Sequence, residues 1–488
     1  MKKDNNVVKQ FLNLGIGTFA SVLLGFLTTP FITRVIDPTE MGKLSIVNSY
    51  VGILLSIAYL GLDKGLIRFF YTRKNIEDEK SLLKLCFGTS LLASIALLLV
   101  YEIAKFFGIV GSLTNLFHLS TTEFSATIYV LIVVYTVISI WNTFSNNLLR
   151  LTYQTKVYSF CMIIQKVAYI IIIGIGVIFH RNDLFILLLS TIGSIATATF
   201  TAVVFTRKYW DFKNLRLPKD KNEIYRYSFP HVTYALLITL IDSLDKFYIQ
   251  RYCNDHEVGV YTSAFSLIVI FTIVQSIFNT IWSPVQTEHF VNNPEDPTFI
   301  RKGNRYITII LFALGFSVIL TKDIVVFLLG QQYRGASTFM PFLVVGSLMY
   351  ILSETVNSGI NISKKSYLLT IVSLGACSID LLALTVLVPT IGAKGAAIAR
   401  CLANMAYFYL TMYYSNKYYY VDYKPIKSFG LLIMILLYSY ENTFINNTGM
   451  NIVLYVVAIM IMIILYRNDI REMLEYFIGQ FLKKENTD

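Results

Sequence analysis

Residues 157–206 read VYSFCMIIQKVAYIIIIGIGVIFHRNDLFILLLSTIGSIATATFTAVVFT, and this stretch decides the fold class. It holds two apolar runs, 157–179 and 183–206, with only a short polar connection between them. A helix rises about 1.5 Å per residue, so about 20 apolar residues cross the roughly 30 Å hydrocarbon core of a bilayer. We therefore expect two consecutive transmembrane helices here.

Runs of this kind recur through the chain of 488 residues, of which 55% are hydrophobic and 15% charged. So much apolar surface cannot be buried inside ordinary soluble domains. We expect an all-α polytopic membrane protein with about fourteen transmembrane helices. The expected spans are 11–33, 44–63, 83–107, 122–144, 157–179, 183–206, 228–250, 259–282, 304–328, 338–360, 367–389, 393–415, 425–440 and 449–466.

Lys and Arg residues are strongly biased to one side of these spans. Of the 41, 30 fall in loops on the side of the N-terminus and 7 on the opposite side, whereas Lys166, Lys246, Lys322 and Arg400 fall inside or at the edge of spans. Because basic residues accumulate in cytoplasmic loops, we expect both termini in the cytoplasm. Membrane topology thus explains the net charge of +11, and the absence of a basic groove with interleaved aromatic residues argues against nucleic-acid binding.

The largest expected cytoplasmic loop separates six spans from eight. The expected organisation is an N-terminal six-helix bundle (1–206), a cytoplasmic linker loop (207–227), a C-terminal six-helix bundle (228–415), an additional helix pair (416–466) and a cytoplasmic amphipathic tail (467–488). The tail has apolar residues at helical spacing, so we interpret it as an interfacial helix on the inner leaflet. A helix packed against another cytoplasmic loop is the alternative.

A short internal match indicates that the two bundles are pseudo-symmetric. The sequence IDPTEMGKLSIVNSY (36–50) resembles CNDHEVGVYTSAFSL (253–267), which aligns Glu40 with Glu257 and Gly42 with Gly259. Each segment follows the first span of its bundle. Repeats in parallel orientation are a common way of building membrane transporters.

Charged residues inside spans are the first candidates for a transport pathway, because a charge in lipid is costly unless it faces a cavity or a partner. The candidate substrate or cavity residues are Asp242, Asp245, Lys246, Glu354, Asp380 and Arg400. Asp242 and Lys246 are four residues apart, so they share a helical face and can pair. We hypothesise that all of these except Glu354 face a central water-filled cavity.

Asp380 and Arg400 lie about ten residues on either side of a turn at 390–392, hence at similar depth in the membrane. A buried ion pair between them is one expectation, and its role is either to join two helices or to serve transport. In transport, Arg400 would bind an anionic headgroup, or Asp380 would titrate in coupling to an ion.

Span seven is expected to open with YSFPHVTYA, which places Pro230 in the first turn of its helix, where a missing N–H costs nothing. The neighbouring His231 is interpreted as a wetted polar residue at the interface, with a proton relay as the alternative.

No catalytic signature is present in the sequence. It has no P-loop of the GxxxxGK[ST] kind, no HExxH and no GxSxG, and its five cysteines show no metal-type spacing. We expect neither an enzyme nor a bound cofactor or metal. Most of the 33 tyrosines are explained by aromatic belts at the membrane interfaces.

Several segments together resemble the polysaccharide flippase branch of the multidrug/oligosaccharidyl-lipid/polysaccharide exporter superfamily. They are RVIDPTEMGKLSIVNSY (34–50), LGLDKGLIRFF (60–70), SFPHVTYALLITLIDSLDKFYI (228–249), EVGVY (257–261), IWSP (281–284) and IGAKGAAIAR (391–400). The resemblance covers nearly the whole chain.

This resemblance implies two bundles around a cavity that opens alternately to either side of a bacterial plasma membrane. The implied cargo is an undecaprenyl-pyrophosphate-linked oligosaccharide repeat unit, moved from the inner to the outer leaflet for surface polysaccharides such as capsule or O-antigen. An H⁺ or Na⁺ gradient is the implied drive. The implied partners are the lipid-linked oligosaccharide, membrane lipids and other polysaccharide-assembly proteins.

The resemblance also singles out Asp245 and Lys246, which occupy an acidic-basic position of the family's span-seven motif. The family more often has Arg second, and Lys keeps the charge but loses the bidentate geometry. A multidrug or peptidoglycan-precursor exporter of the same superfamily is the alternative function. A membrane polymerase or glycosyltransferase would need a large catalytic outer loop, and the expected outer loops are short.

Overall fold

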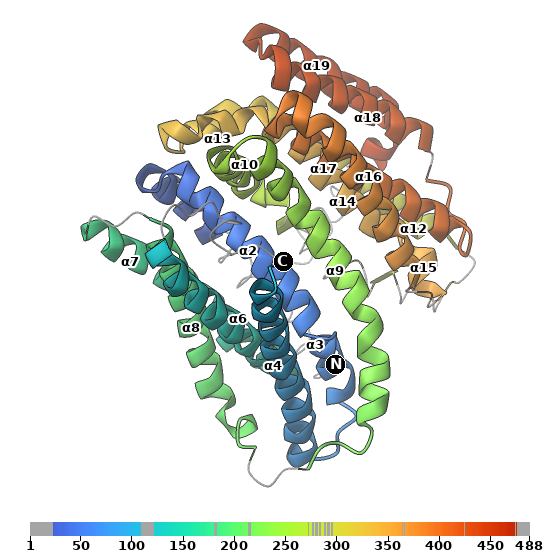
Figure 1. Ribbon diagram of the computed structural model, residues 1–488. Coiled ribbons are helices and arrows are strands. Elements are labelled where there is room, and N and C mark those ends of the chain that lie inside the picture. Colours follow the sequence, from blue (N-terminus) through green and yellow to red (C-terminus); the bar gives the residue numbers. More distant parts are fainter. Residues whose placement is uncertain are drawn as a thin grey trace, which may run out of the picture. The chain divides into compact units, whose positions relative to one another are not determined.

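The computed structural model shows a protein built from helices (Figure 1). It describes residues 23–108, 122–179, 183–212, 216–271, 273–275, 278, 282, 285, 286, 289, 293, 296–363, 365, 367–423, 425–473 and 475. The chain divides into two compact units, residues 1–262 and 263–488. The expected domain limits at the linker and at the C-terminal pair stay predictions.

The first unit is organised around α2. Its helices are Leu23–Val35, α2 (Pro38–Ala58), α3 (Leu62–Phe70), α4 (Ile76–Phe106), α6 (Thr122–Leu151), α7 (Thr155–Ile178), α8 (Leu184–Thr206), the 3₁₀ turn η1 (Arg207–Tyr209) and α9 (Lys221–Tyr252). Helix α2 contacts α4, α6, α8 and α9, and Figure 1 shows it running between α9 and α6.

The second unit follows α10, a helix that begins in the first unit and ends in the second. After α10 (Asp255–Leu267), its elements are α12 (Thr298–Leu320), α13 (Lys322–Phe327), η2 (Gln331–Thr338), α14 (Met340–Val356), α15 (Ser358–Ile362), α16 (Tyr367–Ile391), α17 (Ala393–Asn416), α18 (Pro425–Tyr440), the π-helix η3 (Glu441–Ile445) and α19 (Thr448–Leu465). Helix α17 contacts α14, α15 and α16.

Nine of the described helices are long and apolar enough to cross a membrane, or up to 11 if each of two bent pairs is one span. Three further described helices, Leu23–Val35, α9 and α17, lie at other expected spans. The all-α polytopic membrane fold is therefore confirmed, and the total of about fourteen spans stays a prediction.

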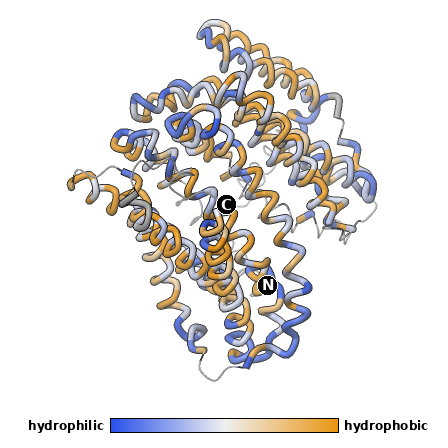
Figure 2. The backbone as a smooth tube through the Cα atoms, viewed as in Figure 1, coloured by the Kyte–Doolittle hydropathy of each residue, from blue (hydrophilic) through white to orange (hydrophobic). Residues whose placement is uncertain are grey.

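Hydropathy follows the expected pattern along these helices. In Figure 2 the helices are hydrophobic over most of their length, and hydrophilic residues gather where α4 and α9 begin. The bilayer explains this distribution, because only helix ends and loops meet water or lipid headgroups.

Helix α9 starts earlier than expected. It begins at Lys221, so Pro230 is inside the helix and not in its first turn, and the expectation from the sequence was wrong. Residues 221–227, which precede the apolar span, form the first turns of the helix and not a loop. A proline inside a helix removes one backbone hydrogen bond, which loosens α9 at this point.

The segment between α8 and α9 is fastened to the first unit at both ends. The Trp210 indole donates to Thr206 Oγ1 at 3.0 Å and packs edge-on against Phe87, with ring centroids 5.2 Å apart. At the other end, the Arg73 guanidinium donates to both carboxylate oxygens of Asp220 at 3.1 and 3.0 Å. Such bidentate pairs fix geometry as well as adding energy.

Helices α16 and α17 form the expected hairpin. Gly392, with φ of 65°, makes the turn between them, a conformation that glycine adopts without steric cost. A Cβ atom on Gly395 would lie 2.4 Å from the Leu387 carbonyl oxygen, so the two helices touch here through their backbones.

The start of the C-terminal tail packs against α12. Arg305 Nη1 lies 3.0 Å from Asp469 Oδ1, and Lys302 pairs with Glu472. The partner here is a helix and not a loop, so both the interfacial helix and its alternative, packing against a cytoplasmic loop, stay predictions. Residues 474 and 476–488, which carry most of the expected interfacial helix, lie outside the described residues.

Candidate functional site

The candidate site begins at the break between α2 and α3. Leu60, with φ of 49°, and Gly61, with φ of 68°, take the left-handed conformation and turn the chain out of α2. This conformation costs energy for most residues and almost none for glycine. Helix α3 then carries three charged residues, Asp63, Lys64 and Arg68, directly after the apolar span.

Helix α9 passes very close to this break. A Cβ atom on Gly61 would lie 2.1 Å from the Ser228 carbonyl oxygen, and one on Gly65 would lie 2.4 Å from Ser228 Oγ. Both distances are far below van der Waals contact. Gly61 meets the backbone of α9 and has a positive φ, so only glycine fits there, whereas at Gly65 the Ser228 side chain would have to rotate. The two glycines therefore set how closely α3 and α9 approach.

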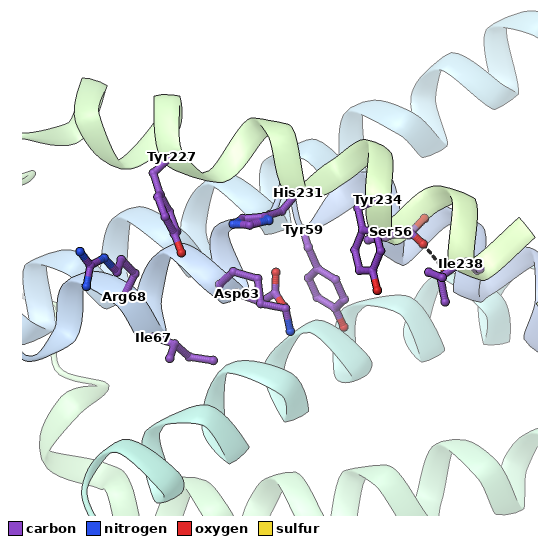
Figure 3. A pocket seen from close by; sticks show the side chains of 13 residues that line it. Ser56, Tyr59, Asp63, Ile67, Arg68, Tyr227, His231, Tyr234 and Ile238 are labelled. Carbon is purple, nitrogen blue, oxygen red and sulfur yellow. Dashed lines mark hydrogen bonds and ion pairs between the residues drawn. The ribbon is translucent and has the colours of Figure 1, made fainter. Parts of the chain in front are cut away.

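A pocket of about 640 Å³ lies between α2, α3 and α9. Its lining residues are Ser56, Tyr59, Gly61, Asp63, Lys64, Ile67, Arg68, Tyr227, His231, Tyr234, Ala235, Ile238 and Thr239. Figure 3 shows Tyr227, His231 and Tyr234 on α9 facing Tyr59 and Asp63. This volume is typical of small-molecule sites, which span roughly 300–1,000 Å³.

Two accessible cations give the pocket its charge. The Lys64 side chain is 60% exposed with its Nζ 3.3 Å from Asp63 Oδ2, and Asp63 is 17% exposed. Arg68 is also exposed, one helical turn further on. Asp63 is the most buried of these three charged side chains, so the pocket presents mainly the positive charge of Lys64 and Arg68 to an incoming group.

Aromatic side chains form the opposite wall. On α9, the His231 ring packs edge-on against Tyr227 with centroids 5.1 Å apart. Across the pocket, at the end of α2, the Tyr59 hydroxyl lies 2.8 Å from Thr143 Oγ1. Phenolic hydroxyls both donate and accept hydrogen bonds, as sugar hydroxyls do. The arrangement can hold an anionic group at α3 and a polyhydroxylated group along α9.

The two matching sequence segments meet at the opposite end of α2. A Cβ atom on Gly42 would lie 1.8 Å from the Asp255 carbonyl oxygen, and one on Gly259 would lie 1.9 Å from the Pro38 carbonyl oxygen. Ser45 Oγ and Thr262 Oγ1 are 3.0 Å apart. Since Ser45 and Thr262 are equivalent by the same alignment as Gly42 and Gly259, this is a reciprocal contact between the repeats.

The predicted site residues of α9 lie away from the pocket. Asp242 is exposed, Lys246 is half-buried, and Asp245 is 1% exposed. The Asp245 carboxylate accepts hydrogen bonds from the Tyr261 hydroxyl and from the Lys246 amide, both at 2.8 Å. These hydrogen bonds hold the buried Asp245 carboxylate in place, which indicates a structural role. None of the three residues lines the pocket.

Replacing Tyr261 by Phe is expected to destabilise the protein without blocking transport. The change removes one of the two donors to a buried carboxylate, which costs about 1–3 kcal/mol. Thermal unfolding of the purified protein in detergent measures the loss, with Tyr248→Phe as a control. Unchanged thermal stability would contradict this role of Tyr261.

The remaining predicted residues belong to the second unit. Glu354 is half-buried and accepts a hydrogen bond from Asn357 Nδ2 at 3.1 Å, and Asp380 is fully buried in α16. The Arg400 guanidinium lies 5.7 Å from the centre of the Phe265 ring. Whether these residues share one cavity with those of α9 stays a prediction.

Sequence reasoning missed most of the pocket. Lys64 and Arg68 were interpreted only as cytoplasmic topology charges, and Tyr59, Asp63 and Tyr234 were not singled out. The available signal was the run LGLDKGLIRFF, where a glycine ends an apolar span and charges return at helical spacing. His231 was noted, and it does line the pocket.

Comparison with known proteins gives the family and the fold. Residues 7–289 match the family model described as polysaccharide biosynthesis protein. The solved structure of the lipid II flippase MurJ in an inward closed conformation has a TM-score of 0.68, with 12% identity over 94% of this chain and 99% of that one. An inward-facing multidrug resistance MATE transporter of the MOP superfamily has a TM-score of 0.63, with 16% identity over 81% and 94%. None of the curated proteins matches.

Proposed function

Since the chain belongs to the polysaccharide biosynthesis protein family, we propose that it flips undecaprenyl-pyrophosphate-linked oligosaccharide repeat units from the inner to the outer leaflet of a bacterial plasma membrane. Two observations support a multi-pass membrane transporter in place of an enzyme: the apolar helices, and a fold similar to those of a lipid II flippase and a multidrug transporter. In this proposal the flipped units serve surface polysaccharides such as capsule or O-antigen.

The pocket between α2, α3 and α9 is the observation that carries the proposal. Lys64 and Arg68 supply exposed positive charge for a pyrophosphate, and the tyrosines of α9 supply hydroxyls for sugars. The basic bias of the loops on the N-terminal side supports a cytoplasmic position for this end of α2. A headgroup entering from the inner leaflet therefore meets the charges first.

The reciprocal glycine contact supports an alternating-access cycle. Gly42 and Gly259 lie at the other end of α2, which the same charge bias assigns to the outer surface. This contact closes the outer end in the proposed cycle while the pocket at the inner end receives the headgroup. In the proposed cycle the contact parts when the headgroup leaves, with an H⁺ or Na⁺ gradient as the drive.

Export of a peptidoglycan precursor is the second candidate function. Its support is the similarity of the fold to the lipid II flippase MurJ, with a TM-score of 0.68 over 94% of this chain. The fold is also shared with multidrug transporters, so the cargo has to be decided by experiment.

The test is a flipping assay with the purified protein in vesicles, offered three cargoes in turn. They are a fluorescent undecaprenyl-pyrophosphate oligosaccharide, fluorescent lipid II and a cationic dye, each with an imposed H⁺ or Na⁺ gradient. Movement of the oligosaccharide lipid supports the proposal. Movement of lipid II alone assigns a peptidoglycan-precursor exporter, and movement of the dye alone a multidrug exporter.

Deletion of the gene in its host gives an independent check. The proposal expects complete lipid-linked repeat units to accumulate in the inner leaflet and surface polysaccharide to be lost. Normal surface polysaccharide together with altered sensitivity to cationic drugs would overturn it.

A further inference from the structure

Lys166 stands out because of the apolar sequence around it. The stretches 11–33, 44–62, 85–101, 127–149 and 184–206 contain no Asp, Glu, Lys or Arg. In the fifth expected span, 157–179, Lys166 is the single charged residue. It is therefore the only charge in the membrane interior of the first six spans, and such a residue marks a functional site by default.

The lysine lies too deep to reach either membrane surface. Helix α7 runs from Thr155 to Ile178, so Lys166 is near its middle, about 17 Å along the axis from each end. A lysine side chain is much shorter than this distance. Snorkelling to the headgroups, the usual solution for a lysine near a helix end, is thus not available.

Lys166 faces the protein and not the lipid. It shares a helical face with the buried residues Thr155 and Ile173, at spacings of three turns and two turns. The exposed hydrophobic residues Ile171 and Ile175 lie on the opposite side of α7. The side chain itself is half-buried.

The absence of a side chain at Gly25 leaves room for the ammonium group. Lys166 Nζ lies 4.0 Å from the position that a Cβ atom would take on Gly25, in the helix Leu23–Val35. Among the described residues, no carboxylate pairs with Lys166 and no acceptor takes a hydrogen bond from its ammonium. A cation inside a membrane protein needs a counter-charge, and within the part of the chain that the structure describes none pairs with Lys166.

We propose that Lys166 is an anion-binding residue of the translocation pathway, which receives a phosphate group of the cargo halfway across the membrane. This rests on the proposed function, because the counter-charge must come from a headgroup that passes through. Lys64 and Arg68 hold the phosphates at the inner end of α2, and Lys166 is the next positive charge inside the first bundle. An ammonium binds phosphate as a point charge from any direction, which suits a transient stop.

The test restores the charge chemically. The five native cysteines are replaced, Lys166→Cys is introduced, and the protein is assayed for flipping of the oligosaccharide lipid in vesicles. Loss of a charge-assisted contact is expected to slow flipping about tenfold or more. Aminoethylation of the thiol, which rebuilds a lysine-like ammonium, restores flipping, whereas methylthiolation, which adds a neutral group, does not.

Two comparisons keep the result interpretable. Val167→Cys, on the lipid-exposed side of α7, is expected to flip normally before and after either modification. Lys166→Arg is expected to retain flipping and Lys166→Met to lose it, with equal amounts of folded protein and unchanged headgroup binding by the Lys64 and Arg68 pocket.

Opposite outcomes overturn the inference. Wild-type rates for unmodified Lys166→Cys, or equal rescue by the charged and the neutral reagent, would show that the charge is not used. Failure of the wild-type protein to flip any phosphate-bearing lipid is a different result, because it refutes the proposed function itself.

Discussion

Replacing Lys64 and Arg68 together by Gln is expected to abolish flipping of a pyrophosphate-linked substrate while leaving the protein folded. Both side chains are exposed in the pocket, and the ion pair lost is that of Lys64, 60% exposed, with Asp63, so little stability is lost. Each charge-assisted hydrogen bond to a phosphate contributes about 1.5–3 kcal/mol. Losing both therefore reduces headgroup affinity by about a hundredfold or more.

Binding and flipping should be measured on the same purified variant. Lys74→Gln is the matched control, since Lys74 is exposed on the same side of the protein and does not line the pocket. Salt should weaken headgroup binding to the wild type, because screening acts on exposed charges. Full activity of the double variant would refute the role of this pocket in headgroup recognition.

The second large effect is expected from Gly42→Ala. A methyl group at this position would lie 1.8 Å from the Asp255 carbonyl oxygen, so α2 and α10 must move apart. Overpacking of this kind costs about 1–3 kcal/mol, and here it falls on the contact that closes the outer end in the proposed cycle. We expect export to be lost and the outer end to stay open.

Thiol labelling from outside the cell measures this opening. A Ser45→Cys reporter, whose native hydroxyl lies 3.0 Å from Thr262 Oγ1, should react with an impermeant reagent faster when Gly42→Ala is present. Gly259→Ala should have the same effect because the contact is reciprocal. Gly88→Ala is the control, since a Cβ there meets nothing within 4 Å. Normal export by Gly42→Ala would show that the contact does not gate transport.

The positions of the helices could be predicted because the bilayer imposes a local rule. Twenty apolar residues in a row must form a helix in lipid, whatever surrounds them. The expected spans 183–206, 367–389 and 425–440 therefore differ from α8, α16 and α18 by at most two residues at either end. The expectation at Pro230 failed because the polar residues before it obey no such rule.

The candidate site was harder to predict because it depends on which helix faces meet. Intramembrane charge selected Asp245, which the tertiary structure places in a buried contact with Tyr261. It did not select Arg68, which lines the pocket only because α9 packs against α3 in the folded protein. A helix that is apolar all round has no polar face that reveals its neighbours.

The sequence by itself determined the membrane fold, the approximate positions of the spans and the similarity of the two repeated segments, because each follows from short-range apolar length or direct similarity. The tertiary structure alone decided that Gly61 admits the backbone of α9 and Gly65 the Ser228 side chain, that the repeats touch through Gly42 and Gly259, and that Lys166 faces inward. These are contacts between residues far apart in the chain, and their distances are set by packing, on which a single helix carries no information.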